Sequence, residues 1–237
     1  MSVREPTACE PTMPPSAPDI ALHFAANLGR AERFDVPFRH FYAEGLLPAA
    51  AIDDLARLPV VAPHLDGLSG RREYHNAARF FCNAKAMQRF PVLAALARAL
   101  QAHAAVAAIE TFCETSLAGT FLRVEYAADS DGFWLEPHTD LGVKKFTCLI
   151  SLAEGELQSS LGTDIYMPDK QLYRRYPFHR GAALVFIPAH DTWHGFEKRP
   201  IAGCRRSLIV NFVGPEWRDR AQLAFPDDPV QGCDRAR

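Results

Sequence analysis

The sequence of 237 residues lacks several features that would place it in a common functional class. It has no uninterrupted run of about 18 apolar residues, the length that a membrane-spanning helix needs. Its first twenty residues contain acidic residues and prolines but no apolar segment, so we expect no secretory signal peptide. The net charge of -2 provides no basic footprint, which argues against nucleic acid or an anionic membrane as partner.

Cysteine is present, but not in the C-x-x-C spacing of zinc ribbons and redox pairs. The six cysteines are scattered over the whole chain, at Cys9, Cys82, Cys113, Cys148, Cys204 and Cys233. Several lie beside apolar residues, so we interpret them as small buried hydrophobic side chains. A reducing cytoplasm is the simplest location for such a chain.

The composition, with 48% hydrophobic residues, is sufficient for one large core without disulfides. We find no internal repeat. Residues 1–18 predict a disordered, proline-rich tail, residues 19–218 a single domain, and residues 219–237 a polar surface tail. Within the domain, helical support is expected at about 45–115, and a β core at about 120–214.

Hydrophobic periodicity predicts the individual elements. Helices are expected at about 49–58 and 92–110, and a short strand at 37–42. After Thr120, several short β-branched and aromatic runs are separated by turn residues, namely FLRVEY, KFTCLISL, TDIYMP, GAALVFIPA and RSLIVNFV. This spacing indicates a β-barrel or sandwich, so the fold class is mostly β with N-terminal helices (α+β).

His138 and Asp140 stand two residues apart in the strand-like stretch WLEPHTDLGVKKF. Residues i and i+2 of a strand share a face, so the imidazole and the carboxylate are expected side by side. Taken alone, an H-x-D pair is weak evidence for a metal site, and a hydrogen-bonded surface pair is the alternative.

A second histidine, His194, follows the strongly apolar strand GAALVFIPA, where a polar side chain requires a reason. Two histidines and one carboxylate form the facial set that binds non-haem Fe(II) and leaves coordination positions open. His190 competes for this role, but it precedes a turn and is more simply interpreted as an exposed residue.

Arg205 and Ser207 lie two residues apart at the start of the last strand. Alternation places them on one face with Ile209 and Asn211. An arginine facing a barrel interior is unfavourable unless it meets an anion. Its planar fork suits a carboxylate, and a serine hydroxyl can add a hydrogen bond. The alternatives are that Arg205 pairs with an internal Asp or Glu, or that the strand faces the other way.

The ordered set HTD, WHGF and RRS resembles the 2-oxoglutarate- and Fe(II)-dependent dioxygenases, and more closely their prolyl-hydroxylase-like branch. The resemblance covers roughly residues 121–213. It implies a double-stranded β-helix (jelly-roll, cupin-like) core flanked by helices. It also implies that His138, Asp140 and His194 bind Fe(II), and that Arg205, assisted by Ser207, binds the distal carboxylate of 2-oxoglutarate.

Tyr126 corresponds to a tyrosine often found near the cosubstrate in this branch, although the loop to His138 is longer than usual. Strand alternation places Arg123 on the face opposite Tyr126, so the two cannot both line the interior without a bulge.

The resemblance further implies that O2 is the other cosubstrate and that succinate and CO2 are released. Related halogenases lack the carboxylate that Asp140 supplies, so its presence favours hydroxylation, or a desaturation. We expect a small polar metabolite, such as a free amino acid or a sugar-linked precursor, as substrate. Two alternatives are a cupin-like metal-dependent isomerase or dioxygenase without 2-oxoglutarate, and a β-barrel binding module without activity.

Five residues are candidates for contact with the substrate, each beside a structural alternative. Trp134 precedes the H-x-D pair and could equally cap the core. Asp164 and Tyr166 lie on a strand expected to cross near the metal, although Asp164 could equally form a turn after Gly162. Arg79 and Asn83 are polar residues within the apolar stretch ARFFCN.

Overall fold

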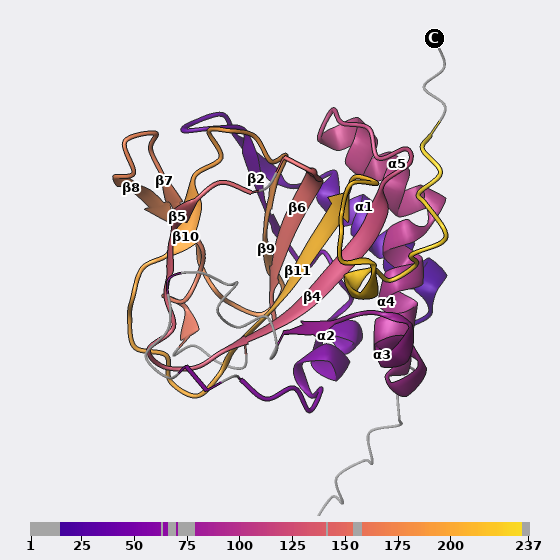
Figure 1. Ribbon diagram of the computed structural model, residues 1–237, viewed down its shortest axis with the longest axis horizontal. Coiled ribbons are helices and arrows are strands. Elements are labelled where there is room, and N and C mark those ends of the chain that lie inside the picture. The colour runs from indigo at the N-terminus through magenta and orange to yellow at the C-terminus, as the bar shows by residue number, and fades with distance from the viewer. Residues whose placement is uncertain are drawn as a thin grey trace, which may run out of the picture.

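Two antiparallel sheets face each other, and helices cover the outer face of the larger sheet (Figure 1). The computed structural model describes residues 15–62, 64–65, 70, 79–140, 142–153 and 158–233. The larger sheet has the order β1-β2-β9-β6-β11-β4-β3, and the smaller sheet has the order β5-β10-β7-β8. This arrangement confirms the predicted α+β class with a jelly-roll core.

The strands of the larger sheet are β1 (Glu32–Phe34), β2 (His40–Glu44), β3 (Phe80–Phe81), β4 (Phe121–Asp129), β6 (Lys144–Ser151), β9 (Ala182–Phe186) and β11 (Arg205–Val213). Those of the smaller sheet are β5 (Leu135–His138), β7 (Asp164–Tyr166), β8 (Leu172–Arg175) and β10 (His194–Phe196). The helices are α1 (Ala17–Leu28), α2 (Ala49–Ala56), α3 (Ala84–Arg89), α4 (Pro91–Gln101) and α5 (His103–Phe112).

β11 lies between β6 and β4, and its side chains point alternately into two separate interiors. Leu208, Val210 and Phe212 are buried in the core that the larger sheet shares with the helices. Arg205 and Ser207 point the other way, into the space between the two sheets. The predicted orientation of this strand is therefore correct.

Helix α1 begins inside the segment predicted as a tail. The Ser16 hydroxyl and the Asp19 carboxylate form a reciprocal capping box at its start. Its apolar side, which includes Ile20 and Phe24, is fully buried. The prediction of a disordered tail at residues 1–18 is therefore wrong at its C-terminal end, although the S-x-x-D pattern of a helix start is present in the sequence. Residues 1–14 lie outside the described part of the chain.

The helix predicted at 92–110 is two helices. α4 and α5 meet at the extended residue Ala102 with a bend of 53°, and both pack against α1. Alanine favours helix, so local propensity gave no warning of this break. No single helix within the described ranges is long and apolar enough to span a membrane; α4 and α5 pass that test only when taken together across the bend.

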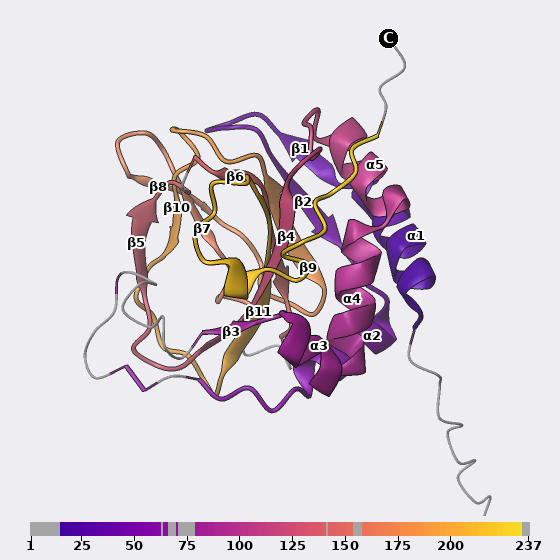
Figure 2. The same cartoon turned by 45° about the vertical axis from the view of Figure 1, so that its right-hand side comes forward.

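The C-terminal segment is packed rather than loose. After the 3-10 helix η3 (Arg220–Gln222), Leu223 and Val230 are 1% and 2% exposed. The Val230 backbone binds that of Thr120 and Gly119, and the segment continues toward α5 (Figure 2). The predicted surface tail at 219–237 is therefore wrong up to residue 233, because the sparse apolar residues in this polar stretch are buried; residues 234–237 are not described.

Three of the cysteines are buried, as predicted. Cys82, Cys113 and Cys148 are free thiols in the core shared by the helices and the larger sheet. Burial raises the pKa of the Cys82 and Cys113 thiols to about 12, so both stay protonated and behave as hydrophobic groups.

Candidate metal centre

Three predicted ligands converge between the sheets. His138 ends β5 and His194 begins β10, and the two residues are direct partners in the pairing of these strands. Their ring centroids are 4.3 Å apart. With Asp140, they place one ligand atom each within 4.8 Å of one another. His190, the competing histidine, is exposed and outside this group. The cluster has the composition of a facial metal site.

Both histidines are oriented by the backbone. His138 Nδ1 lies 2.8 Å from the Glu136 carbonyl oxygen, and His194 Nδ1 lies 2.9 Å from the Thr192 carbonyl oxygen. A carbonyl only accepts hydrogen bonds, so each Nδ1 carries a proton and Nε2 is the ring nitrogen left to bind a metal. Burial lowers the pKa of His194 to about 4, and His138 contributes to this shift, so His194 is neutral at pH 7.

Asp140 is held through both carboxylate oxygens. Lys144 donates to Oδ1 at 2.5 Å, and the Thr147 hydroxyl donates to Oδ2 at 2.7 Å. Burial by itself raises the pKa of Asp140, but Lys144, His194 and Thr147 outweigh it and lower that pKa well below its usual range. The carboxylate is therefore ionised, as a metal ligand must be. Two imidazoles and one carboxylate fit a divalent iron ion.

A row of polar side chains leads from Asp140 across the larger sheet. Thr147, Asn211 and Arg123 are cross-strand neighbours on β6, β11 and β4. Asn211 Nδ2 donates to the Thr147 hydroxyl at 2.9 Å, and Arg123 Nη1 donates to Asn211 Oδ1 at 3.0 Å. The ligand Asp140 is thus connected, through one residue on β6 and one on β11, to a buried arginine on β4.

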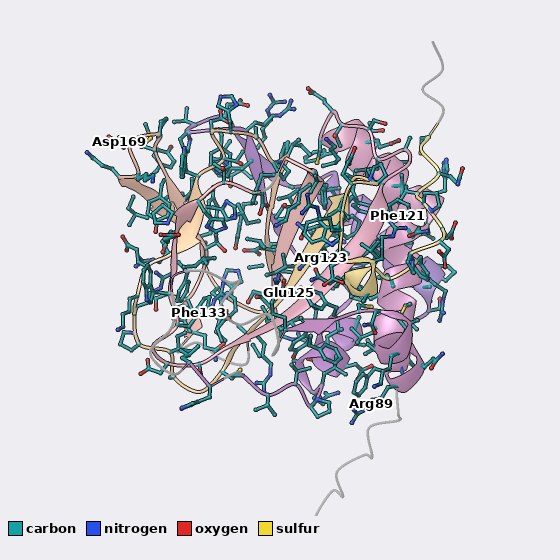
Figure 3. All side chains as sticks on the ribbon, viewed as in Figure 1. Arg89, Phe121, Arg123, Glu125, Phe133 and Asp169 are labelled. Atoms are coloured by element: carbon teal, nitrogen blue, oxygen red, sulfur yellow. The ribbon has the colours of Figure 1, made fainter. Side chains whose placement is uncertain are left out.

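Glu125 joins this row to the edge of the sheet. It neighbours Arg123 on β4, and both project from that strand (Figure 3). Arg79 donates to both Glu125 oxygens, at 3.0 and 2.5 Å, and Arg123 donates to Oε2 at 3.0 Å. Sequence reasoning selected Arg79 alone of these three residues, and it placed Arg123 correctly on the face opposite Tyr126.

The cavity that contains the three ligands has a volume of about 630 Å³ including its open mouth. Its apolar wall comes from both sheets, namely Phe133, Leu135, Leu149, Phe196 and Ile209. Arg79, Arg123, Glu125 and Lys144 are among its polar lining residues, as are Arg205 and Ser207. The cavity therefore combines a metal-ligand set with strongly charged walls.

Arg205 is buried at 6% exposure and is held on several sides. Its Nη1 donates to Asp129 Oδ2 at 2.6 Å, and its Nε donates to the Leu161 carbonyl at 2.7 Å. The rings of Phe178 and Phe196 lie 4.8 and 4.7 Å from its guanidinium. The alternative that Arg205 pairs with an internal carboxylate is thus realised, and the pair still faces the cavity.

Comparison with known proteins identifies solved structures with a similar fold. No protein-family model and no curated protein sequence matches the chain. A prolyl-4-hydroxylase structure from Pseudomonas putida matches with a TM-score of 0.52 and 16% identity, over 86% of this chain and 99% of that chain. A prolyl 4-hydroxylase from Phytophthora capsici matches with a TM-score of 0.51 and 12% identity, over 74% of this chain and 58% of that chain.

The fold is similar to that of these two prolyl 4-hydroxylases. The resemblance inferred from HTD, WHGF and RRS is confirmed at this level. The identities are low, so the likeness concerns the fold, and the case for activity depends on the cavity itself.

Tyr126 and Trp134 do not lie where they were expected. Tyr126 is in the helix-side core, where its hydroxyl donates to the Leu55 carbonyl at 3.0 Å. Trp134 turns away from the cavity that its neighbours Phe133 and Leu135 line, and packs on Gly70, where a Cβ would lie 2.6 Å from the indole. Strand alternation puts both side chains on the wrong face for the cavity.

Asp164 and Tyr166 are also absent from the cavity wall. Asp164 is fully buried, and it accepts hydrogen bonds from Arg175, Arg199 and the Glu197 backbone. These three donors use its carboxylate structurally, so the predicted substrate contact is not supported. Tyr166 is 3% exposed and lies two residues further along the same strand.

Asn83 has a local structural role. Its side chain accepts from the Ala86 backbone at 3.1 Å and caps helix α3, while its amide donates to the Ala221 carbonyl. The sequence A-R-F-F-C-N therefore contributes one residue to the cavity, Arg79, and one helix cap.

Proposed function

We propose that this protein is an Fe(II)- and 2-oxoglutarate-dependent oxygenase that hydroxylates a C–H bond of a small polar metabolite. The proposed substrate is a free amino acid or a sugar-linked precursor. Succinate and CO2 are the coproducts. The proposal depends above all on the convergence of His138, Asp140 and His194 in one cavity of this fold.

The protein's own residues have distinct tasks in this function. His138 and His194 would direct their Nε2 atoms, and Asp140 its carboxylate, to iron. Arg205 and Ser207 would receive the distal carboxylate of 2-oxoglutarate. Both line the cavity, and Arg205 is already oriented by Asp129 and Leu161. The rigid placement of Arg205 limits the entropy lost when the cosubstrate binds.

The apolar part of the wall has a different task. Phe133, Leu135 and Phe196 exclude water around the ligands, which strengthens the charge interactions inside the cavity. When bound, iron and 2-oxoglutarate supply the oxidising chemistry with O2. The chain binds and orients the reactants.

A cupin-like metal enzyme that does not use 2-oxoglutarate is the second candidate. The observation in its favour is that Arg205 already has a counter-ion, because Asp129 lies 2.6 Å away. In that case the arginine would need no carboxylate from a cosubstrate, and Ser207 would lack its assigned task.

Anaerobic titration of the Fe(II)-loaded protein with 2-oxoglutarate tests the proposal. We expect the weak visible absorption band of an iron–2-oxoglutarate chelate, reaching its maximum at one equivalent. Asp140→Ala and His194→Ala should each lose Fe(II) binding while circular dichroism retains the folded signal. Iron binding without the band would favour the second candidate, and unchanged iron binding in both variants would refute the assignment of the ligands.

A further inference from the structure

The cavity has a second cationic end that the proposed function leaves unassigned. Arg205 marks one end of the inward face of β11, and Asn211, which accepts from Arg123, lies six residues further along. At the rise of an antiparallel strand, this separation is about 20 Å. Lys144 and Arg123, which lie beside Val213 and Asn211 in the sheet, therefore line a region of the wall remote from the site assigned to the distal carboxylate of 2-oxoglutarate, and Arg79 reaches this region through Glu125.

Charges at this second end are unequal among the described residues of the wall. Its cations are Lys144, Arg123 and Arg79, and its carboxylates are Glu125 and Asp140. Asp140 is the carboxylate that Lys144 contacts, and it is also a proposed metal ligand. A divalent ion bound to Asp140 competes with Lys144 for that negative charge.

Unused hydrogen-bond donors accompany this cationic excess. An arginine has five N–H groups, and within the described part of the chain Arg123 donates through three of them, to Gln222, Asn211 and Glu125. An ammonium has three, and Lys144 donates to Asp140. The Arg123 side chain is 1% exposed and that of Lys144 is 15% exposed, so neither charge is well solvated. Glu125 already lies beside Arg123 and Asp140 beside Lys144, so a further anion here would offset the third cation of this end.

We infer that the Lys144–Arg123 end of the cavity is a subsite for a carboxylate group of the substrate. The ammonium supplies a mobile point charge, and the guanidinium supplies planar donors. Glu125 keeps Arg123 and Arg79 apart and aligned, and Thr147 and Asn211 connect the subsite to the ligand Asp140. The inference rests on the proposed function, and it narrows the small polar metabolite to an acidic one.

Matched pairs of N-acetyl amino acids and their primary amides probe this subsite directly. The members of each pair have nearly the same size and differ in the carboxylate. Calorimetric titration under nitrogen, with Fe(II) and 2-oxoglutarate at saturating concentrations, measures binding without turnover. We expect the acids to bind about tenfold or more tightly than their amides, because a charge-assisted hydrogen bond replaces a neutral one.

Three variants assign that preference to a residue. Lys144→Met should reduce the ratio of acid to amide affinity toward one, and Lys144→Arg should retain a preference for the acid. Lys145→Met is the matched control, because Lys145 is the next residue on β6 and is exposed. It should leave the ratio unchanged.

The outcomes separate this inference from the function on which it rests. Equal affinities, or no binding of any acid, while the iron–2-oxoglutarate band is present would overturn the subsite and leave the oxygenase proposal standing. A loss of 2-oxoglutarate affinity in Lys144→Met, with the ratio unchanged, would also overturn it, because this end would then hold the cosubstrate. If the unaltered protein gives no band, the oxygenase proposal fails. In that case, the difference in affinity between acids and amides for the metal-loaded protein still tests the subsite by itself.

Discussion

Two buried carboxylates in this molecule are each held by two arginines, and they lie in different surroundings. Asp164, on β7 of the smaller sheet, accepts from Arg175 and Arg199 at 2.7 Å each. Glu125, on β4 of the larger sheet, accepts from Arg79 and Arg123. Both carboxylates are 1% exposed or less. In the burial of the carboxylate and the number of arginines that contact it, the two clusters are alike.

Their neighbours separate the two clusters. Arg199 continues to the Gly162 and Glu197 carbonyls, and Arg175 continues to the Glu197 carboxylate, so that network ties loops to the edge of the smaller sheet. Arg123 instead continues through Asn211 and Thr147 to the ligand Asp140. A charged cluster of this kind therefore takes its role from the cavity that it faces.

The largest effect on stability is expected for Asp164→Ala. It removes the shared partner of two arginines, and breaking a buried ion pair typically costs about 3–5 kcal/mol. Denaturant unfolding measures this loss. The folded fraction should bind Fe(II) with unchanged stoichiometry, because Asp164 does not line the cavity.

Glu197→Gln is the matched control for that variant, since the Glu197 side chain is 47% exposed and binds the same Arg175. It should cost less than about 1 kcal/mol. A specific loss of iron binding in folded Asp164→Ala would break the comparison, because the smaller-sheet cluster would then also serve the metal centre.

A smaller effect, on ligand binding, is expected for Arg205→Ala. Truncating one partner of a buried charged pair costs about 2–5 kcal/mol in binding, so the affinity for 2-oxoglutarate should fall by that amount. Arg206→Ala is the control on the opposite face of β11, and calorimetry measures both. If Arg206→Ala has the large effect and Arg205→Ala does not, the assignment of Arg205 is refuted.

The smallest of these effects is expected for Thr147→Val, which keeps the shape of the side chain and removes its hydroxyl. Asp140 loses one of its two side-chain donors, and Asn211 loses an acceptor. Loss of such an orienting contact typically weakens metal binding about 10–100-fold. Metal titration checks this, and an unchanged affinity would show that the row from Arg123 to Asp140 does not position the ligand.

Part of the fold was predictable because strand and helix periods are local. The strands β4, β6, β9 and β11 lie close to the predicted runs, and the alternation that points Arg205 and Ser207 inward was predicted correctly. The break at Ala102 was not predictable, because alanine has the highest helix propensity; α4 and α5 each pack against α1. The start of α1 was predictable and was missed.

The substrate candidates failed for a different reason. Asp164 and Asn83 are polar residues within apolar stretches, and such residues serve equally as ion-pair partners or helix caps. Lys144, Thr147, Asn211 and Arg123 were overlooked as site residues because no motif links them. Only strand register brings β4, β6 and β11 together at this point.

The chemistry of the ligands was readable from the sequence alone, because H-x-D and a later histidine are the residue types of a facial metal site; the pairing of β5 with β10 brings His194 beside His138. The tertiary structure decided which further charges surround them. Cross-strand pairing joins residues that are from 64 to 88 positions apart, such as Asn211 with Thr147 and with Arg123. Contacts of that range depend on the register of whole sheets, which the local sequence does not encode.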